Sequence, residues 1–496
     1  MGCNALCSNN AGDHNIAIGK NAGRLITDTG NVIIGGEAGH SATNEEHNVF
    51  IGYYAGGNSE GSQNTAIGTY ALCYATTNGC NVAVGSRAGH CACGPFNIMI
   101  GHCAAREAHG ASNGVFIGCS AGKHNCGSRN IGIGDCALFG STTVSDNDGG
   151  CNISLGACAG KSTTSGKSNI FMGLKAGCSN LTGHYNVFFG QYAGKSHVCN
   201  QGGSGNVYIG KNAGSASTNT YNNVYIGPNA GHSSVVSSFD NGEGHSNVYI
   251  GQNAGYSVGG NWNSRNVFIG RNAGCSANAG CSVIIGSTIG KNADGGSNVL
   301  IGRCVAIDSN YDAHGNVFMG YYTGQKNTSG DYNVYLGQKA ARCATTGEYN
   351  FIGGCGAVSV GALTGNSNVI LGNEAGKNAT SGSTNIFIGC GTASNGTITG
   401  DYNHMFGKNA GEELTSGYRN NAMGNSALED LSTGRCNVAI GPQAGNKVTT
   451  GCNNITLGAF AGCLIAGGDD NIFFGDSAGR NTADANKNIF IGSCAG

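Results

Sequence analysis

The sequence predicts an all-β fold, a parallel β-solenoid (a β-roll or β-helix) of about 28 turns. The first observation behind this prediction is a repeated unit, Asn-x-x-Ile-Gly-x-x-Ala-Gly, whose central glycine returns every 17.5 residues on average. The second is that glycine supplies 91 of 496 residues. The third is a short run of β-branched residues before each central glycine, which favours a strand. A short unit repeated along a chain is typical of a solenoid.

Each copy contains one predicted strand. All 28 copies carry Ile, Val, Leu, Met or Phe just before the central glycine, which we call the marker glycine. Two places earlier, 24 copies carry Val or Ile, and the exceptions are Thr65, Asn350, His404 and Asn421. Side chains of a strand alternate between its faces, so these two positions share one face, which we expect to form the core. Strands stacked about 4.8 Å apart would make a rod on the order of 130 Å long.

The residues on either side of the strand suit turns. Asparagine opens 25 of the 28 copies, and Gly114, Ser282 and Tyr349 replace it in the others. Asparagine tolerates turn conformations, and its amide can form hydrogen bonds with amides above and below it in a stack. The marker glycine and the following Ala-Gly fit a tight corner, because glycine reaches positive φ without strain. We expect all these residues to be architectural.

The middle residue of each strand is expected to point away from the core. It is aromatic in 14 of 28 copies. A solvent-exposed aromatic stripe of that length would exceed what soluble monomers tolerate, and a strand that is apolar on both faces is usually buried on both. We therefore predict that this stripe is an interface with another copy of the chain, formed by Phe50, Phe116, Phe171, Phe188, Tyr208, Tyr225, Tyr249, Phe268, Phe318, Tyr335, Phe351, Phe387, Phe473 and Phe490.

Charge and hydropathy argue against two classes of partner. Lys and Arg number 25 and Asp and Glu 27, so no basic field is available for nucleic acid. No apolar run approaches the roughly 18 residues of a membrane-spanning helix. Residues 1–8 (MGCNALCS) do not resemble a signal peptide. We expect a chain that neither binds nucleic acid nor spans a membrane.

The repeat divides the chain into two parts. Residues 1–14 read as a degenerate N-terminal copy that caps the repeat, and residues 15–496 as one continuous solenoid domain. No capping segment follows the last copy, and a bare final strand offers unpaired N–H and C=O groups. We expect another chain at that end, either the next identical subunit in an end-to-end stack or a second fibre protein.

The unit resembles the Asn/Gly-rich repeats of bacteriophage and large-virus fibre proteins. It is also similar to the Asn-Ser-x-Ala-Ile-Gly repeat in the heads of trimeric autotransporter adhesins. The resemblance spans residues 15–496 and implies a homotrimeric structural fibre that recognises a host or surface, located on a virion or outside the cell. The turn is longer than in adhesin heads, and no heptad stalk, membrane anchor or secretion signal is recognisable, which favours a viral or phage fibre.

Two other functions remain open. The first is a self-polymerising extracellular filament protein. The second is a left-handed β-helix acyltransferase, because Ile-Gly-x-x-Ala-Gly matches one hexapeptide of that fold. Such an enzyme would need a histidine at an inter-subunit cleft, and none of the 13 histidines stands out. The sequence has no nucleophile elbow, zinc-protease motif, Walker loop or EF-hand, so we predict no enzyme and no cofactor.

Cysteine is abundant, with 24 residues. Cys136 and Cys158 occupy the same place in successive turns, two residues after the marker glycine, which puts them within reach of a disulfide. The alternative is that cysteines fill tight corners as small apolar residues. The group His90, Cys91, Cys93, His102 and Cys103 matches no standard zinc module, so no metal site is predicted.

Insertions between copies are the expected place for added function, because they leave the core intact. The long ones cover residues 139–151, 195–205, 232–246 and 256–265. Aromatic rings with polar neighbours could bind a cell-surface glycan or receptor, and we predict such a site at Phe239, Asp240, His245, Tyr256 and Trp262. The alternative is that these loops are tolerated decoration.

Overall fold

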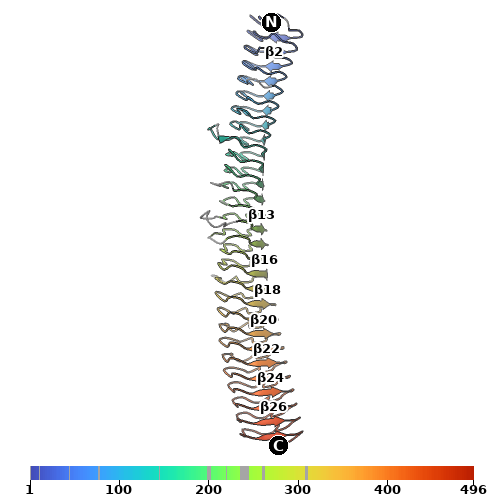
Figure 1. The fold of residues 1–496 in the computed structure, drawn as a ribbon, viewed down its shortest axis with the longest axis vertical. Helices are drawn as coiled ribbons and strands as arrows, with labels where there is room; N and C mark the ends of the chain where they lie inside the picture. The colour runs from blue at the N-terminus through green and yellow to red at the C-terminus, as the bar shows by residue number, and fades with distance from the viewer. Residues whose placement is uncertain are drawn as a thin grey trace. The chain divides into compact units, whose positions relative to one another are not determined.

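The computed structural model confirms an all-β parallel solenoid with one strand per turn and no α-helix in the part of the chain it describes. It describes residues 2–10, 12–43, 45–75, 79–143, 146–197, 203–218, 220–234, 245–259, 263–307 and 311–496. The chain forms two compact units, Met1–Asn261 and Trp262–Gly496. Within each unit, consecutive strands lie side by side in chain order (Figure 1).

The strands are short and evenly spaced. The first unit contains β1(Ile16–Ile18), β2(Val32–Ile34), β3(Val49–Ile51), β4(Thr65–Ile67), β5(Val82–Val84), β6(Ile98–Ile100), β7(Val115–Ile117), β8(Ile131–Ile133), β9(Ile153–Leu155), β10(Ile170–Met172), β11(Val187–Phe189), β12(Val207–Ile209), β13(Val224–Ile226) and β14(Val248–Ile250). The second unit contains β15(Val267–Ile269), β16(Val283–Ser287), β17(Val299–Arg303), β18(Val317–Tyr321), β19(Val334–Leu336), β20(Phe351–Gly353), β21(Val369–Leu371), β22(Ile386–Ile388), β23(His404–Phe406), β24(Asn421–Met423), β25(Val438–Ile440), β26(Ile455–Leu457), β27(Ile472–Phe474) and β28(Ile489–Ile491).

Successive strands pair in parallel and in register, so each residue lies beside its equivalent in the next turn. In β12 and β13, for example, Tyr208 pairs with Tyr225. The marker glycines follow the same register. Gly210 has φ +131°, and a Cβ there would lie 2.7 Å from the carbonyl group of Gly227 in the next turn. Glycine is therefore required by both the conformation and the closeness of the neighbouring backbone.

The orientation of the strand is the reverse of the sequence-based prediction. The middle residue of every strand except β28 is buried inside the solenoid, whereas the residues before and after it face outward and are partly or fully exposed. Tyr208, Tyr225 and Tyr249 each have an exposed fraction of 0%. The Val and Ile positions predicted to form the core instead form the outer face of the sheet.

A column of buried asparagines runs beside the strands, as predicted. The backbone N–H of Asn169 donates to Oδ1 of Asn152 at 2.9 Å, and that of Asn186 donates to Oδ1 of Asn169 at 2.9 Å. The Nδ2 of Asn169 donates to the carbonyl oxygen of Gly183 in the next turn at 2.7 Å. Each amide thus satisfies backbone groups of its neighbours, which makes a buried polar column stable.

The structure also corrects the register of one copy. The sequence analysis placed Tyr349 at the opening position, but Asn350 occupies it, with its backbone N–H donating to Oδ1 of Asn333 at 2.8 Å. Ile352 is therefore the buried middle residue of β20, and Phe351 faces outward with 39% of its surface exposed. Only Gly114 and Ser282 interrupt the asparagine column.

The segment predicted to be a degenerate copy packs as the corner of a turn without a strand. The backbone N–H of Leu6 donates to the carbonyl oxygen of Ala22 at 3.0 Å, and the backbone N–H of Ser8 donates to the carbonyl oxygen of Arg24 at 2.9 Å. Nδ2 of Asn4 donates to Oδ1 of Asn21 at 3.1 Å. The described residues of this segment therefore stack on the first full turn and continue the turn-to-turn hydrogen bonding.

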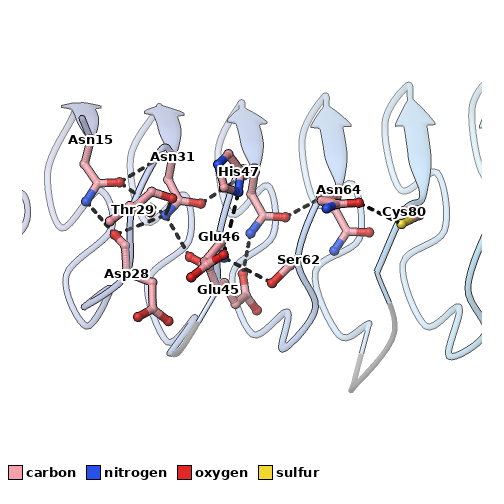
Figure 2. A network of polar contacts seen from close by, with 12 residues as sticks. Asn15, Asp28, Thr29, Asn31, Glu45, Glu46, His47, Ser62, Asn64 and Cys80 are labelled. Atoms are coloured by element: carbon pink, nitrogen blue, oxygen red, sulfur yellow. Dashed lines mark hydrogen bonds and ion pairs between the residues drawn. The ribbon is translucent and has the colours of Figure 1, made fainter. Parts of the chain in front are cut away.

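A buried acid interrupts the inner corner beside the asparagine column (Figure 2). Glu45 is 0% exposed, and its Oε2 accepts a hydrogen bond from Nδ2 of Asn48 at 3.2 Å, while its Oε1 has no hydrogen-bond partner among the described residues. Its carbonyl oxygen accepts from Nδ2 of Asn31 at 2.8 Å. Burial raises the pKa of Glu45 to about 9; the backbone of Gly61 opposes the shift, and the charge of Glu60 adds to it. The carboxyl group is therefore neutral at pH 7.

We predict that this acid makes stability depend on pH. The unfolded chain releases the proton near the ordinary value of 4.5, whereas the folded chain keeps it up to about 9. The folded state therefore binds more protons between these values, and its stability falls as pH rises from 4.5 to 9. Glu45→Gln removes the titration, so its melting temperature should increasingly exceed that of the parent chain as pH rises over this range.

The exposed neighbour provides a matched control for this experiment. Glu46 lies next in sequence and faces solvent, so Glu46→Gln removes the same charge without touching the buried site. Differential scanning calorimetry at several pH values compares the three chains. The interpretation is wrong if Glu45→Gln and the parent chain lose stability with pH at the same rate.

Candidate functional site: the apolar outer face of the sheet

The outer face of the sheet is a continuous apolar surface in each unit. It consists of the first and third residues of every strand, two parallel columns that contain Val, Ile, Leu, Met and Phe almost throughout. None of these positions carries Asp, Glu, Lys or Arg. An uncharged apolar face that repeats at every turn has no structural role in the core described above, so it is the main candidate for a binding surface.

Exposure along this face is substantial. Side chains in each column pack against their equivalents above and below, which leaves most of them half-buried. The most exposed outer-face residues of the first unit are Ile16, Ile18, Ile67, Ile98, Ile100, Ile133 and Phe189. Those of the second unit are Met319, Phe351, Ile388, Met423, Ile440, Ile472, Phe474, Ile489 and Ile491.

Three polar residues interrupt the face, and the outward orientation explains them. Thr65, His404 and Asn421 stand at the first position of their strands, where the sequence analysis treated them as exceptions in a core column. Nδ1 of His404 lies 3.0 Å from Oδ1 of Asn421, on the neighbouring strand. A polar pair that would be costly inside the solenoid is easily accommodated on its surface.

The size of the face is comparable with a protein interface. Two columns about 10 Å wide together, over fourteen strands about 4.8 Å apart, present on the order of 700 Å² in each unit. The largest apolar patch on an ordinary monomer is about 300–600 Å², and a stable interface buries about 800 Å² per partner. The face of each unit is therefore larger than an ordinary surface patch and close to the area that one partner contributes to a stable interface.

The aromatic residues predicted to form an interface lie instead inside the solenoid, and that prediction is wrong. Burial is complete, at 0% exposure, for Phe50, Phe116, Phe171, Phe188, Tyr208, Tyr225, Tyr249, Phe268, Phe318, Tyr335, Phe387 and Phe473. Phe490 is half-buried and stacks on Phe473 with ring centroids 5.2 Å apart. Phe351 faces outward, because its copy is shifted by one residue.

The rings stack on one another along the core because the strands are in register. The centroids of Tyr208 and Tyr225 are 4.8 Å apart with an angle of 3° between the ring planes, and Tyr225 repeats this geometry with Tyr249. The hydroxyl of Tyr225 donates to Oγ of Ser234 at 3.1 Å, and burial raises its pKa. These side chains touch no solvent and cannot contact a second chain directly.

A compensation in side-chain volume supports this orientation and was visible in the sequence. The middle residue shares the core with the fourth residue after the marker glycine. A Cβ on Gly214 would lie 2.5 Å from the ring of Tyr208. Where a buried leucine takes the corner place, the middle residue is Ala or Gly: Leu72 goes with Ala66, Leu138 with Gly132, and Leu428 with Ala422.

The predicted glycan site is only partly within the described residues. Phe239, Asp240 and Trp262 lie outside them. Tyr256 stacks on His232 with ring centroids 5.0 Å apart, and His245 contacts Tyr221 edge to face at 4.8 Å. Burial lowers the pKa of His245. His245 and Tyr256 therefore each contact a ring of another turn.

The cysteines follow the repeat register. The backbone N–H of Cys158 donates to the carbonyl of Asp135 at 2.8 Å, which places Cys158 beside Cys136, as the spacing predicted, and both thiols are free. In the other cysteine group, Nδ1 of His90 lies 3.1 Å from Sγ of Cys91, and Nε2 of His102 lies 3.3 Å from Sγ of Cys103. Among the described residues, no three His, Cys, Asp or Glu side chains converge as a metal site.

No family model and no curated protein sequence matches the chain. Across the described ranges, no helix has the length and hydrophobicity to cross a lipid bilayer.

We predict that the middle and corner positions are coupled in stability. Gly214→Leu places a large side chain against Tyr208 and should destabilise the chain by about 1–3 kcal/mol. Tyr208→Ala removes a buried ring and should cost about 3–5 kcal/mol. The double variant reproduces the combination of Ala66 and Leu72, so it should be more stable than the sum of the two changes predicts, by about 1–3 kcal/mol.

Thermal unfolding of the parent chain, both single variants and the double variant measures this coupling. Leu72 shows that leucine is compatible with the backbone at this corner. Its φ is 47°, close to the 55° of Gly214. Strictly additive effects would show that the two positions do not share core space.

Proposed function

We propose that this chain is the subunit of a structural fibre of viral or phage tail-fibre-like or adhesin-like type, which associates with further copies of itself and presents loops for host or surface recognition. The observation that carries the proposal is the uncharged apolar outer face, which repeats at every strand of both units. A solenoid with such a face gains stability by covering it, because burial of apolar surface contributes about 25 cal/mol per Å².

A second copy of the chain is the partner that matches this face best. A partner that covers the whole face needs apolar groups at the same spacing of about 4.8 Å over many turns. Another copy of the chain has the same spacing, because its turns repeat in the same way. The face carries no Asp, Glu, Lys or Arg side chain that would attract an oppositely charged partner or repel an identical chain. Symmetric association of identical chains is also the usual route to an oligomer.

Three copies is the number we propose. The resemblance to the Asn/Gly-rich repeats of fibre proteins and to adhesin heads supports a homotrimer, and a threefold axis along the stack lets three parallel chains bury their outer faces together. The same resemblance supports a location on the virion surface or outside the cell, and a cell-surface glycan or receptor as the target of the insertions between Lys195 and Arg265.

Lysine substitutions on the outer face test the proposal. Met172, Phe189 and Ile250 are outer-face residues of β10, β11 and β14. Changing all three to lysine places three charges in the proposed interface while the buried middle residues stay intact. We expect the mass of the particle, measured by light scattering, to fall from that of three chains to that of one, with the β-sheet circular dichroism retained.

The chain offers a matched control two residues further on in the same three turns. Leu174, Gln191 and Gln252 are exposed at the first corner, so their replacement by lysine adds the same charge outside the face. The control should stay trimeric. A parent chain that is monomeric at all concentrations, or equal behaviour of the two triple variants, would refute the proposal; a ladder of larger species from the parent chain would indicate a self-polymerising filament instead.

A further inference from the structure

Cys136 and Cys158 are distinguished from the other cysteines by their place in the stack. Of the described cysteines, no other two lie in register on successive turns, judged by the backbone hydrogen bonds between turns. Both residues stand two places after a marker glycine. Both have left-handed φ values, 52° and 55°, so their Cα–Cβ bonds leave the corner in the same direction.

The distance between the two residues suits a covalent bond. Parallel neighbours in register are about 4.8 Å apart, within the about 4.4–6.8 Å that disulfides span between Cα atoms. Both side chains are half-buried, so a small oxidant can reach them. Sγ of Cys136 lies 3.6 Å from Oδ1 of Asp135.

We propose that Cys136 and Cys158 form a disulfide that joins two adjacent turns of the first unit when a low-molecular-weight disulfide is present. One protein thiolate attacks the oxidant and forms a mixed disulfide, which releases one small thiol. The second protein thiolate then attacks the mixed disulfide, which releases the other small thiol. The protein loses two hydrogen atoms, and the oxidant is reduced to two thiols.

A third cysteine, Cys178, is the alternative partner for Cys158, and the structure distinguishes between the two pairings. Cys178 lies in the next turn, close enough for its pKa to be raised by Cys158, after the larger effect of burial. It is three residues out of register, however. The backbone N–H of Ser162 donates to its carbonyl at 3.0 Å, so Cys178 lies beside Lys161 and not beside Cys158. The register therefore selects Cys136 as the partner of Cys158.

The thiol environment predicts the pH dependence of the reaction. Burial raises the pKa of Cys136 to about 11, with Asp135 and Cys158 adding to the shift and Lys161 opposing it. The thiolate is the attacking species, so the bond should form faster at pH 9 than at pH 7. Reversal by dithiothreitol should restore the free thiols.

The full chain incubated with oxidised glutathione tests the proposal. Peptide mapping without reduction should find the Cys136 and Cys158 peptides linked, and the link should disappear in Cys136→Ser and Cys158→Ser and persist in Cys178→Ser. Serine is a suitable replacement, because Ser120 occupies the equivalent place in the turn before Cys136. The oxidised parent chain should also melt at a higher temperature than the reduced chain, and Cys136→Ser should show no such shift.

Three outcomes would overturn the proposal. They are a link between Cys158 and Cys178, glutathione adducts on both thiols without a link, and no reaction at either thiol. The melting temperatures of the reduced variants show whether they fold, so loss of the link in Cys136→Ser cannot be confused with unfolding. The test does not depend on the oligomeric state, and it stands apart from the proposed fibre function.

Discussion

In-register stacking of parallel turns is the constraint on which the rest of this structure depends. Each strand is only three to five residues long, so no turn can bury enough surface alone, and stability comes from the equivalent residues of its neighbours. The stacking places chemically equivalent side chains of successive turns next to each other. Tyrosine rings lie parallel at 4.8 Å, buried amides bond along a column, and two cysteines occupy equivalent corners of adjacent turns. Each of these contacts repeats because the backbone repeats.

In-register stacking also means that few side chains fill the core of each turn. One middle side chain and one corner side chain per turn fill it, so volume added at one place must be removed at the other. A ring at the middle position is accommodated by glycine at the corner in most turns, and Leu72, Leu138 and Leu428 are accommodated by Ala66, Gly132 and Ala422. Dense interiors respond to changes of this size, which explains why the two positions vary together.

The repeat predicted the solenoid, the asparagine column and the register of Cys136 with Cys158, because these depend only on spacing along the chain. It did not predict which face of the strand is buried. All three strand residues are apolar, and a shift of one residue exchanges the faces without changing the hydrophobic pattern. The decisive signals were the polar residues Thr65, His404 and Asn421 at the flanking positions and the volume compensation at the corner. The insertions carry no repeat, so spacing could not place Trp262.

In the corrected orientation, the middle column and the flanking columns of the repeat are under different physical constraints. The middle column varies from glycine to tyrosine and is matched within the chain, whereas most residues of the flanking columns are Val, Ile, Leu or Met. Internal packing does not require that uniformity, because these side chains face outward. The proposed association with identical chains would require it, since every turn would then meet an equivalent turn. His404 and Asn421 are compatible with the proposed association, because their side chains bond each other along the face and would leave fewer polar groups for a partner to desolvate.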